Sequence, residues 1–314
     1  MTDKLPARVG RVPLQSVGKA SAKDYIDQAE KRLLELFGEH DADKVNAKRR
    51  ALLAGDIDWH LYYHLSPLRA NLLSWYEFKA GAKVLEVGAG CGAITEELVR
   101  RDVKVTALEL SARRCLINAH RNHAAGNLEI VAGNLEDYPA KLTFDYVVCV
   151  GALEYAGEYL KADQPYEAFL RHLHATLRPG GKLLLATENR MGLKYWAGAR
   201  EDHSGRYFEG LNSYPNRPAV QTFGKNELNE LLSSSKFKAN RFYYLYPDYK
   251  TPYMVYSDDY YPGHRASFPL ARLPSPGFSR PREHFFSEQS AMRHLETNDL
   301  FRQLANAFLV EATA

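Results

Sequence analysis

Hydrophobic residues in the first part of the chain recur at helical spacing. Residues 22–39 carry apolar positions three or four apart, which predicts a helix, and residues 43–54 predict a second helix that ends near Gly55. Ser66 and Pro67 open a third helix, because proline is well placed in a first helical turn. Residues 1–20 show little periodicity, so we expect an irregular arm there.

From residue 82 onward, short apolar runs alternate with amphipathic helices. Continuous apolar strands that alternate with helices are typical of a parallel sheet covered on both faces. Right-handed crossovers then predict a doubly wound, mostly parallel α/β fold. The expected strands are 83–87, 104–109, 128–132, 144–150 and 181–187, and the expected helices lie near 93–101, 111–124 and 165–177.

The alternation is interrupted after residue 188. Residues 189–223 are rich in Gly and Pro, and a loop of that length is usually functional or disordered. The remaining elements are expected to be a helix at 225–235, a strand pair at 241–246 and 253–257, a Pro- and Tyr-rich segment at 258–281, a helical stretch at 283–306 and a closing strand at 307–311. We therefore expect an N-terminal arm and helical cap (1–65), a core (66–260) with a substrate insert (189–223), and a C-terminal extension packing on the core (261–314).

Composition excludes several classes of protein. A net charge of +3 is too small for a nucleic-acid-binding domain. Cys91, Cys115 and Cys149 lie far apart, so we expect no metal site and no disulfide, and reduced thiols indicate the cytoplasm. The start of the chain lacks the apolar region of a signal peptide, and no apolar run approaches the ~20 residues that span a bilayer, so we expect no stable membrane insertion.

A glycine-rich turn follows the first strand of the core. Gly88–Gly92 allow the backbone to turn tightly and to approach a nucleotide-like ligand. A dinucleotide pattern is formally satisfied through Ala93. Glu86, however, lies inside the strand, where a carboxylate suits the ammonium and sulfonium of S-adenosylmethionine (SAM) better than a pyrophosphate. Glu109 ends the next strand and can bind ribose hydroxyls of either cofactor.

The ends of the later strands supply further candidates. Asn134 can present its amide to an adenine edge, and Leu135 can cover the ring. Tyr63 and Arg69 precede the first strand and can contact the cofactor carboxylate. The cofactor-binding candidates are Tyr63, Arg69, Glu86, Gly88, Ala89, Gly90, Glu109, Leu110, Asn134, Leu135, Val150 and Gly151.

These segments, in this order, resemble the successive motifs of class I SAM-dependent methyltransferases over residues 60–260. The motifs are E-x-G-x-G-x-G at Glu86–Gly92, the acidic strand end at Glu109, the fourth strand after Phe144-Asp145, and L-R-P-G-G at Leu177–Gly181. The resemblance implies a seven-stranded sheet whose last two strands form an antiparallel pair, a place that the 241–257 pair fits. It also implies SAM as the cofactor.

Two positions depart from the family pattern. Asn134 stands where the family often has Asp. The Asn/Asp-Pro-Pro-Tyr motif of many enzymes that methylate amino groups on nucleic acid is replaced by Gly151–Glu154. This replacement disfavours DNA N-methylation, so nucleic acid is not an expected partner.

Methyl transfer depends on positioning, and an alcohol acceptor also benefits from a general base. His203 has a suitable intrinsic pKa, Asp202 precedes it, and Glu154 follows the fourth strand, so these three are the catalytic candidates. The substrate candidates are Tyr155, Asn189, Tyr195 and Tyr249. Aromatic rings mixed with polar groups suit a sugar or another polar ring.

The expected function is transfer of a methyl group from SAM to a hydroxyl, or an amine, of a small molecule or glycan. The segments 188–195 and 201–206 resemble methyltransferases of bacterial surface-polysaccharide synthesis. The alternatives are a natural-product N-methyltransferase, an NAD(P)-dependent oxidoreductase and a non-catalytic SAM-fold binding subunit. A homodimer, or association with other biosynthetic enzymes, stays open.

Overall fold

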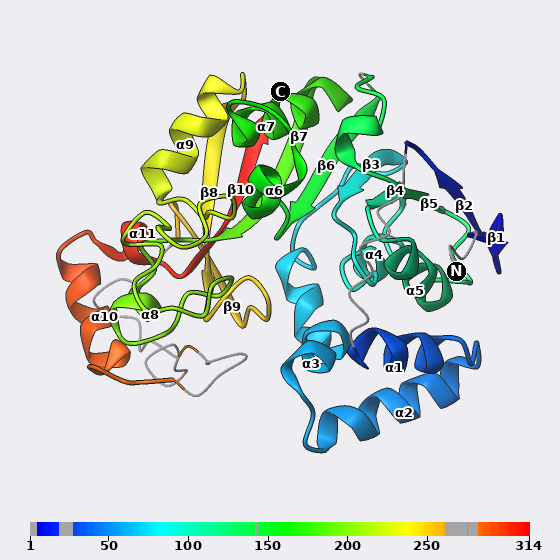
Figure 1. The fold of residues 1–314 in the computed structure, drawn as a ribbon, viewed down its shortest axis with the longest axis horizontal. Coiled ribbons are helices and arrows are strands. Elements are labelled where there is room, and N and C mark those ends of the chain that lie inside the picture. Colours follow the sequence, from blue (N-terminus) through cyan, green and yellow to red (C-terminus); the bar gives the residue numbers. More distant parts are fainter. Residues whose placement is uncertain (1–4, 19–27, 142, 261–274, 276–281) are drawn as a thin grey trace. The chain divides into compact units, whose positions relative to one another are not determined.

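The computed structural model describes residues 5–18, 28–141, 143–260, 275 and 282–314 (Figure 1). The chain divides into two compact units, Met1–Val148 with Ala175–Gly181 (unit 1) and Cys149–His174 with Lys182–Ala314 (unit 2). The expected boundaries at 65/66 and 260/261 are not tested by these units and stay predictions. Most of the expected segment 258–281 lies outside the described residues.

Unit 1 contains the first strands and the N-terminal helices. Its elements are β1 (Arg8–Val9), β2 (Val12–Ser16), α1 (Gln28–Phe37), α2 (Ala42–Ala54), α3 (Trp59–Leu65), the 3-10 helix η1 (Pro67–Leu72), β3 (Ala82–Val87), α4 (Thr95–Leu98), β4 (Val103–Glu109), α5 (Ala112–Arg121), β5 (Leu128–Ala132), the 3-10 helix η2 (Leu135–Asp137) and most of β6 (Phe144–Val150). The strand order in this unit is β1-β2-β5-β4-β3-β6. The pairs β2·β5, β5·β4 and β4·β3 are parallel.

This strand order confirms the α/β prediction for unit 1. The chain builds outward from β3 through β4 to β5 and then returns to the other side of β3 with β6. Ligands of open α/β sheets bind beyond the carboxyl ends of the strands, where the order reverses. The carboxyl end of β3 therefore marks the expected ligand position.

The N-terminal arm differs from the sequence prediction. Residues 8–16 are not irregular but form β1 and β2, and β2 adds to the free edge of β5. Val12 and Leu14 alternate with exposed neighbours, so one face of β2 is buried. Pro13 is tolerated because its missing N–H costs little on the short β1–β2 hairpin, where it lies opposite Arg8.

The helical cap agrees with the prediction in part: α1 and α2 lie at predicted positions, whereas the third predicted helix, opened by Ser66 and Pro67, is the short 3-10 helix η1. α2 ends at the predicted Gly55, and the Ser66 hydroxyl accepts a hydrogen bond from the Leu68 amide at the start of η1. The expected helix at 22–39 is described from residue 28 onward, and residues 19–27 lie outside the described part. The cap packs on the glycine turn in one apolar cluster, whose buried members are Ala29, Leu33, Leu36, Phe37, Leu61, Leu65, Cys91 and Ile117.

Unit 2 contains an antiparallel sheet in the order β7-β10-β8-β9. Its elements are the 3-10 helix η3 (Leu153–Tyr155), α6 (Ala156–Tyr159), α7 (Pro165–Thr176, which ends in unit 1), β7 (Leu177–Glu188, which begins in unit 1), α8 (Leu193–Trp196), α9 (Lys225–Ser234), β8 (Lys238–Tyr246), β9 (Met254–Ser257), α10 (Glu288–Thr297), α11 (Phe301–Leu304) and β10 (Ala307–Thr313).

The strand count is a correction, because the described residues form ten strands and not seven. β1 and β2 were not expected as strands, and β10, expected as a closing strand at 307–311, adds to the seven strands that the family resemblance implied. The pairing of β8 with β9 is antiparallel as predicted, but the antiparallel neighbour of β7 is the C-terminal strand β10. Every residue from Ala307 to Val310 is buried, because β10 is paired on both edges.

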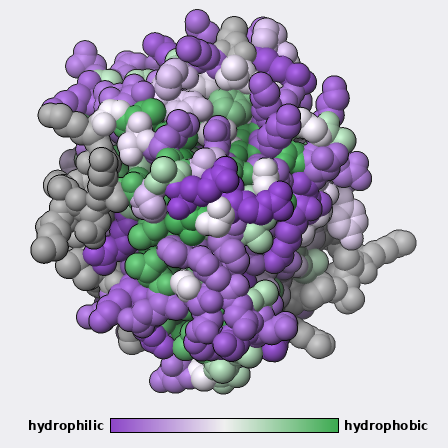
Figure 2. All heavy atoms as spheres, turned by 90° about the vertical axis from the view of Figure 1, so that its right-hand side faces the viewer, coloured by the Kyte–Doolittle hydropathy of each residue, from purple (hydrophilic) through white to green (hydrophobic). Residues whose placement is uncertain are grey.

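Other predicted elements differ in extent. The stretch 283–306 forms α10 and α11, separated by Asp299 with φ of 57°. α4 covers only part of 93–101. No helix in the described part of the chain has the length and hydropathy to cross a membrane. On the face drawn in Figure 2, hydrophilic residues predominate and hydrophobic residues gather in small groups between them, which is ordinary for a protein surface.

Candidate functional site

The loop after β3 places three glycines in the left-handed region. Gly88, Gly90 and Gly92 have φ values of 75°, 53° and 80°. A Cβ atom on Gly92 would lie 2.3 Å from the Asn118 side-chain oxygen, so glycine is needed there for packing. A Cβ atom on Gly90 would meet no described atom within 4 Å. The backbone at Gly90 therefore borders open space, as a close approach to a ligand requires.

Glu109 holds this loop from the end of β4. Its two carboxylate oxygens accept hydrogen bonds from the Gly90 amide and the Ser111 amide, each at 2.9 Å. Glu109 is buried, and Leu110 beside it is half-buried. A carboxylate has about four lone-pair sites, so two remain for further donors. The predicted role in binding ribose hydroxyls is compatible with this geometry and stays a prediction.

Glu86 is buried below the loop, and its partner comes from α4. The Thr95 hydroxyl donates to the Glu86 carboxylate at 2.6 Å, and the Asn118 amide donates to the Thr95 oxygen at 2.9 Å. Burial raises the pKa of Glu86 to about 8, against smaller lowering effects of Thr95 and Arg69. A cation next to such a carboxyl favours its ionised form. The environment of Glu86 thus fits the cationic part of SAM.

Tyr63, in α3, and Arg69, in η1, lie together in unit 1. Arg69 is buried, and its guanidinium carbon lies 4.2 Å from the centre of the Tyr63 ring. Burial, and then the charges of nearby arginines including Arg69, hold the pKa of His64 well below its usual value. This part of unit 1 therefore keeps His64 neutral and presents Arg69 as a cation. The predicted contact of Arg69 with a cofactor carboxylate is untested.

The remaining cofactor candidates lie at later strand ends. Leu135 is buried, and the Asn134 side-chain oxygen accepts from the Leu135 amide at 2.8 Å, which caps η2. Asn134 thus uses part of its amide locally. Val150 and Gly151 belong to unit 2. A Cβ atom on Gly151, which has φ of 64°, would lie 2.5 Å from the Tyr249 hydroxyl.

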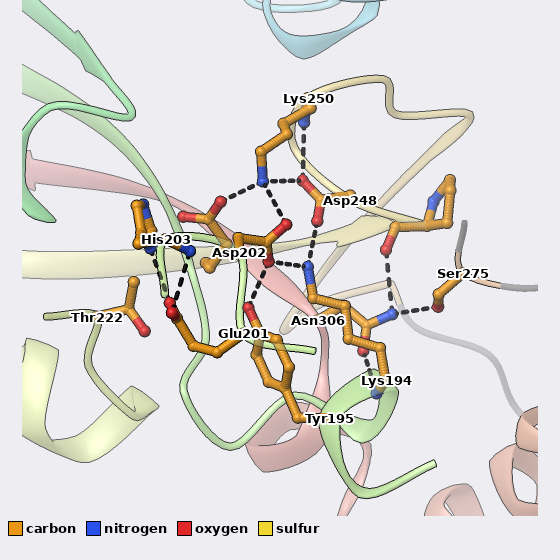
Figure 3. A network of polar contacts seen from close by, with 12 residues as sticks. Lys194, Tyr195, Glu201, Asp202, His203, Thr222, Asp248, Lys250, Ser275 and Asn306 are labelled. Atoms are coloured by element: carbon orange, nitrogen blue, oxygen red, sulfur yellow. Dashed lines mark hydrogen bonds and ion pairs between the residues drawn. The ribbon is translucent and has the colours of Figure 1, made fainter. Parts of the chain in front are cut away.

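Unit 2 contains a buried network of charged side chains (Figure 3). We call the following residues the charge network: Glu188, Lys194, Glu201, Asp202, His203, Asp248 and Lys250. The Lys194 ammonium lies 2.8 Å from Asp202 and 2.7 Å from Asp248, and the Tyr195 hydroxyl donates to Asp202 at 2.6 Å. The Lys250 ammonium pairs with Glu188 and lies 3.4 Å from Asp202. Asp202 is therefore committed to two lysines.

His203 pairs with Glu201 and not with its neighbour Asp202. The Nδ1 atom of His203 lies 2.8 Å from a Glu201 oxygen, and the Tyr155 and His203 rings pack nearly perpendicular with their centres 5.3 Å apart. Burial alone would lower the pKa of His203, but the Glu201 hydrogen bond and the charges of Glu188, Glu201 and Glu154 raise it to about 9. His203 is thus an imidazolium near neutral pH. Its predicted role as a base requires loss of that proton.

Glu154 is the most unusual of the predicted catalytic residues. It is 1% exposed, and neither of its carboxylate oxygens has a hydrogen-bond partner among the residues that the structure describes. Burial and then the charge of Glu188 raise its pKa, and the lowering effect of the His203 charge does not outweigh them. The second oxygen of Glu188 is likewise buried without a partner in the described part of the chain.

Two predicted substrate residues have structural partners. The Asn189 amide donates to the carbonyl oxygens of Gln303 and Ala305 at 2.8 and 2.7 Å, and its oxygen accepts from the Met191 amide. Tyr195 is fully buried beside Asp202. Asn189 therefore anchors the start of the insert on the segment before β10.

The sequence analysis did not identify Lys194, Glu201, Asp248 and Lys250 as site residues. Their signal was present, because Lys194 and Asp248 each interrupt an apolar or aromatic stretch. Asp248 is completely buried, and charged residues are almost never buried unless they are paired. Which partner each residue has follows only from the fold.

Comparison with known proteins identifies relatives over part of the chain. Residues 85–183 match a family model described as a methyltransferase domain. The ubiquinone biosynthesis O-methyltransferase of Xanthomonas oryzae pv. oryzae is 31% identical over 159 residues, which cover 49% of this chain and 63% of that protein. The mitochondrial ubiquinone biosynthesis O-methyltransferase of Schizosaccharomyces pombe is 32% identical over 117 residues, covering 35% of this chain and 39% of that protein.

These relatives are matched over less than two thirds of their length. The solved structure of Haemonchus contortus phosphoethanolamine N-methyltransferase 2 in complex with S-adenosyl-L-methionine is 14% identical, with a TM-score of 0.46, and covers 78% of this chain and 51% of that chain. The domain match supports the predicted methyltransferase domain and, with it, SAM as the cofactor. The names of these three proteins do not mention polysaccharide or natural-product synthesis. The expected link to these pathways therefore stays a prediction.

Proposed function

We propose that the chain is a SAM-dependent methyltransferase that methylates a hydroxyl, or an amine, of a small molecule or glycan. The observation that carries the proposal is the loop after β3, where Gly90 borders open space and Glu109 holds the Gly90 amide at 2.9 Å. The match of residues 85–183 to a methyltransferase domain supports it.

The residues of unit 1 fit the chemical groups of SAM. Glu86 offers a buried carboxylate to a cation, Arg69 offers a guanidinium to a carboxylate, and Glu109 retains lone pairs for ribose hydroxyls. When bound, SAM supplies a methyl group on a positively charged sulfur. Unit 1 contributes orientation, because a displacement of this kind needs nucleophile, methyl group and sulfur in line.

The NAD(P)-dependent alternative is disfavoured by Glu86. A pyrophosphate at the glycine loop would lie close to a buried carboxyl group, and ionisation of that group would repel it. The non-catalytic alternative predicts SAM binding without transfer, or no SAM binding at all. Both alternatives are separated from the proposal by the experiments below.

Selection of the acceptor is assigned, in this proposal, to unit 2. The insert 189–223 and Tyr155, Tyr195 and Tyr249 supply aromatic and polar side chains, and the charge network lies in the same unit. The names of the two curated relatives favour a hydroxyl acceptor. A glycan acceptor and a natural product remain members of this class.

The cofactor is tested by calorimetric titration with SAM and, separately, with NAD. We expect SAM to bind and NAD not to bind. Glu109→Ala should weaken SAM binding by about tenfold to a hundredfold, because it removes charge-assisted hydrogen bonds to the loop. Glu129→Ala is the matched control, since Glu129 is an exposed acid on the neighbouring strand that accepts from Thr106.

The activity is tested by transfer of radiolabelled methyl from SAM to fractionated pools of hydroxylated and amine-bearing metabolites. Label in any acceptor fraction, lost in Glu109→Ala, supports the proposal. SAM binding without transfer to any pool would instead identify a binding subunit. Tight NAD binding in the same titration would identify an oxidoreductase.

A further inference from the structure

The Lys194 ammonium shows which contacts the charge network makes with a buried cation. It bridges two carboxylates, at 2.8 Å from Asp202 and 2.7 Å from Asp248, and lies 4.9 Å from the centre of the Tyr195 ring. The carboxylates supply charge and hydrogen-bond acceptors, and the ring adds a cation–π contact. This arrangement lets a charged group remain buried.

The Lys250 ammonium repeats the same pattern. It pairs with Glu188, lies 3.4 Å from Asp202, and lies 4.8 Å from the centre of the Tyr249 ring. Both ammonium groups thus combine at least two carboxylates with a tyrosine face. At Lys250 and Asp202 the network reaches the surface, because their side chains are 12% and 16% exposed.

Glu154 and Glu188 are two further buried carboxyl groups, and Lys250 pairs with only one oxygen of Glu188. Both oxygens of Glu154 and one oxygen of Glu188 are buried without a hydrogen-bond partner among the described residues. The Gly151 amide donates to the Ala186 carbonyl at 2.9 Å, which places the segment of Glu154 beside the end of β7, and the charge of Glu188 raises the pKa of Glu154. Tyr155 follows Glu154 in sequence, and its ring packs nearly perpendicular to the His203 ring.

The charge network and Glu154 together contain more acidic than basic groups. Glu154 and the four acids of the charge network outnumber its three basic groups, Lys194, His203 and Lys250. A buried carboxylate without a donor costs free energy, so the group is held neutral or is paired with a ligand. The three oxygens without partners would each accept one N–H bond from a ligand.

We propose that Glu154 and Glu188 form a subsite for an alkylammonium group, so that the methyl acceptor is an amine-bearing small molecule. The statement that the bound amine is the methyl acceptor rests on the proposed function. The existence of the subsite does not depend on that function. An alkylammonium has several N–H donors, and it is chemically similar to the Lys194 and Lys250 ammonium groups that carboxylates of the same network bind. No bond is made or broken at the subsite, which recognises the acceptor.

The test measures binding without SAM, using 2-phenylethylammonium as the probe and 2-phenylethanol as its neutral analogue. We expect the ammonium to bind at least about tenfold more tightly than the alcohol, because only the ammonium forms charge-assisted hydrogen bonds. Glu154 is largely protonated near neutral pH, since its pKa is raised. Binding of the cation should therefore release a proton, which calorimetry in two buffers of different ionisation enthalpy detects.

The decisive variant is Glu154→Gln. It should weaken binding of 2-phenylethylammonium by about thirtyfold or more and abolish proton release, because a buried charge partner is lost. Glu158→Gln is the matched control, since Glu158 is an exposed acid in the same segment that pairs with Arg217. Glu154→Met, of similar volume, serves as the second variant if Glu154→Gln does not fold.

Four results would overturn the subsite: no binding of the ammonium, equal binding of ammonium and alcohol, unchanged binding in Glu154→Gln, or displacement of the ammonium by Mg²⁺ alone at equal concentration. The first would leave Glu154 and Glu188 as a pair of carboxyl groups that share a proton. Failure of the proposed methyltransferase function would be visible separately, as absent SAM binding or absent methyl transfer, while the ammonium titration would be unaffected.

Discussion

Gly90 and Gly92 belong to one motif, but the structure predicts different consequences when each is replaced by alanine. Both residues have positive φ, at 53° and 80°, so alanine at either position costs about 1–2 kcal/mol of backbone strain. At Gly92 the new methyl group would also lie 2.3 Å from the Asn118 oxygen. At Gly90 it would enter open space.

The added cost at Gly92 follows from the position of Asn118. Asn118 is completely buried and donates to Thr95 at 2.9 Å, so displacing it breaks buried hydrogen bonds. Each such loss costs about 1–3 kcal/mol. Gly92→Ala should therefore lower the free energy of unfolding by roughly 2–5 kcal/mol, measured by urea denaturation of unliganded protein.

Gly90→Ala should have the opposite profile. The free energy of unfolding should fall only by the backbone strain of about 1–2 kcal/mol. SAM affinity should fall by about tenfold or more, because a methyl group overlaps the space that the ligand needs. Gly81→Ala is the matched control, since Gly81 has φ of 71°, meets no described atom within 4 Å and lies before β3. Titration calorimetry with SAM gives the affinities.

The reasoning would be refuted by either of two results. Wild-type SAM affinity in Gly90→Ala would show that the open space is not used by the ligand. An equal loss of SAM affinity in Gly81→Ala would show that backbone strain in unit 1, and not overlap with the ligand, causes the effect.

Three further predictions concern buried charges. Because the pKa of Glu86 is about 8, SAM affinity should rise roughly tenfold per pH unit up to about pH 8. Glu86→Gln should remove this pH dependence. A SAM affinity of the wild type that does not change with pH would contradict a contact between Glu86 and the cation. NMR titration should give a pKa near 9 for His203, and Glu201→Gln should lower that pKa by replacing the carboxylate charge with a neutral amide; an unchanged pKa would exclude the pairing. Lys194→Met should destabilise the protein by about 3–5 kcal/mol in urea denaturation, because Asp248 loses its buried partner, and adding Asp248→Asn should restore part of that loss; strict additivity of the two changes would contradict the pairing.

The cofactor loop was predictable because its signal is local. Glu86, Gly88, Gly90 and Gly92 are adjacent in sequence, and a strand-to-helix turn brings them together without help from distant residues. The strands of the parallel sheet were predictable for the same reason, since each is a short continuous apolar run. Only the role of each glycine needed the structure.

The charge network was not predictable, because its ion pairs join distant parts of the chain. Lys194 meets Asp248 only through the folding of unit 2, and Lys250 meets Glu188 in the same way. Sequence adjacency was misleading at Asp202 and His203, since the first pairs with lysines and the second with Glu201. Adjacent residues of a turn often face different neighbours.

Two strand assignments show the same limit. β2 is short and contains Pro13, which removes a hydrogen-bond donor and weakens the strand pattern. β10 was expected as a closing strand, but its place between β7 and β8 depends on pairing along its whole length. Periodicity identifies a strand, whereas the order of strands in an antiparallel sheet depends on their partners.

The buried chain below the loop explains why the motif carries both a glycine and an acid. Asn122 donates to Asn118 at 2.8 Å, Asn118 donates to Thr95, and Thr95 donates to Glu86 at 2.6 Å. Glycine at position 92 leaves room for Asn118, and Asn118 positions the hydroxyl that orients Glu86. Glu86 and Gly92 are the first and last residues of the motif. If Glu86 orients the cofactor, both residues act through this one line of hydrogen bonds. Asn118→Leu, which cannot donate to Thr95, should then weaken SAM binding although Asn118 follows the next strand and not the loop.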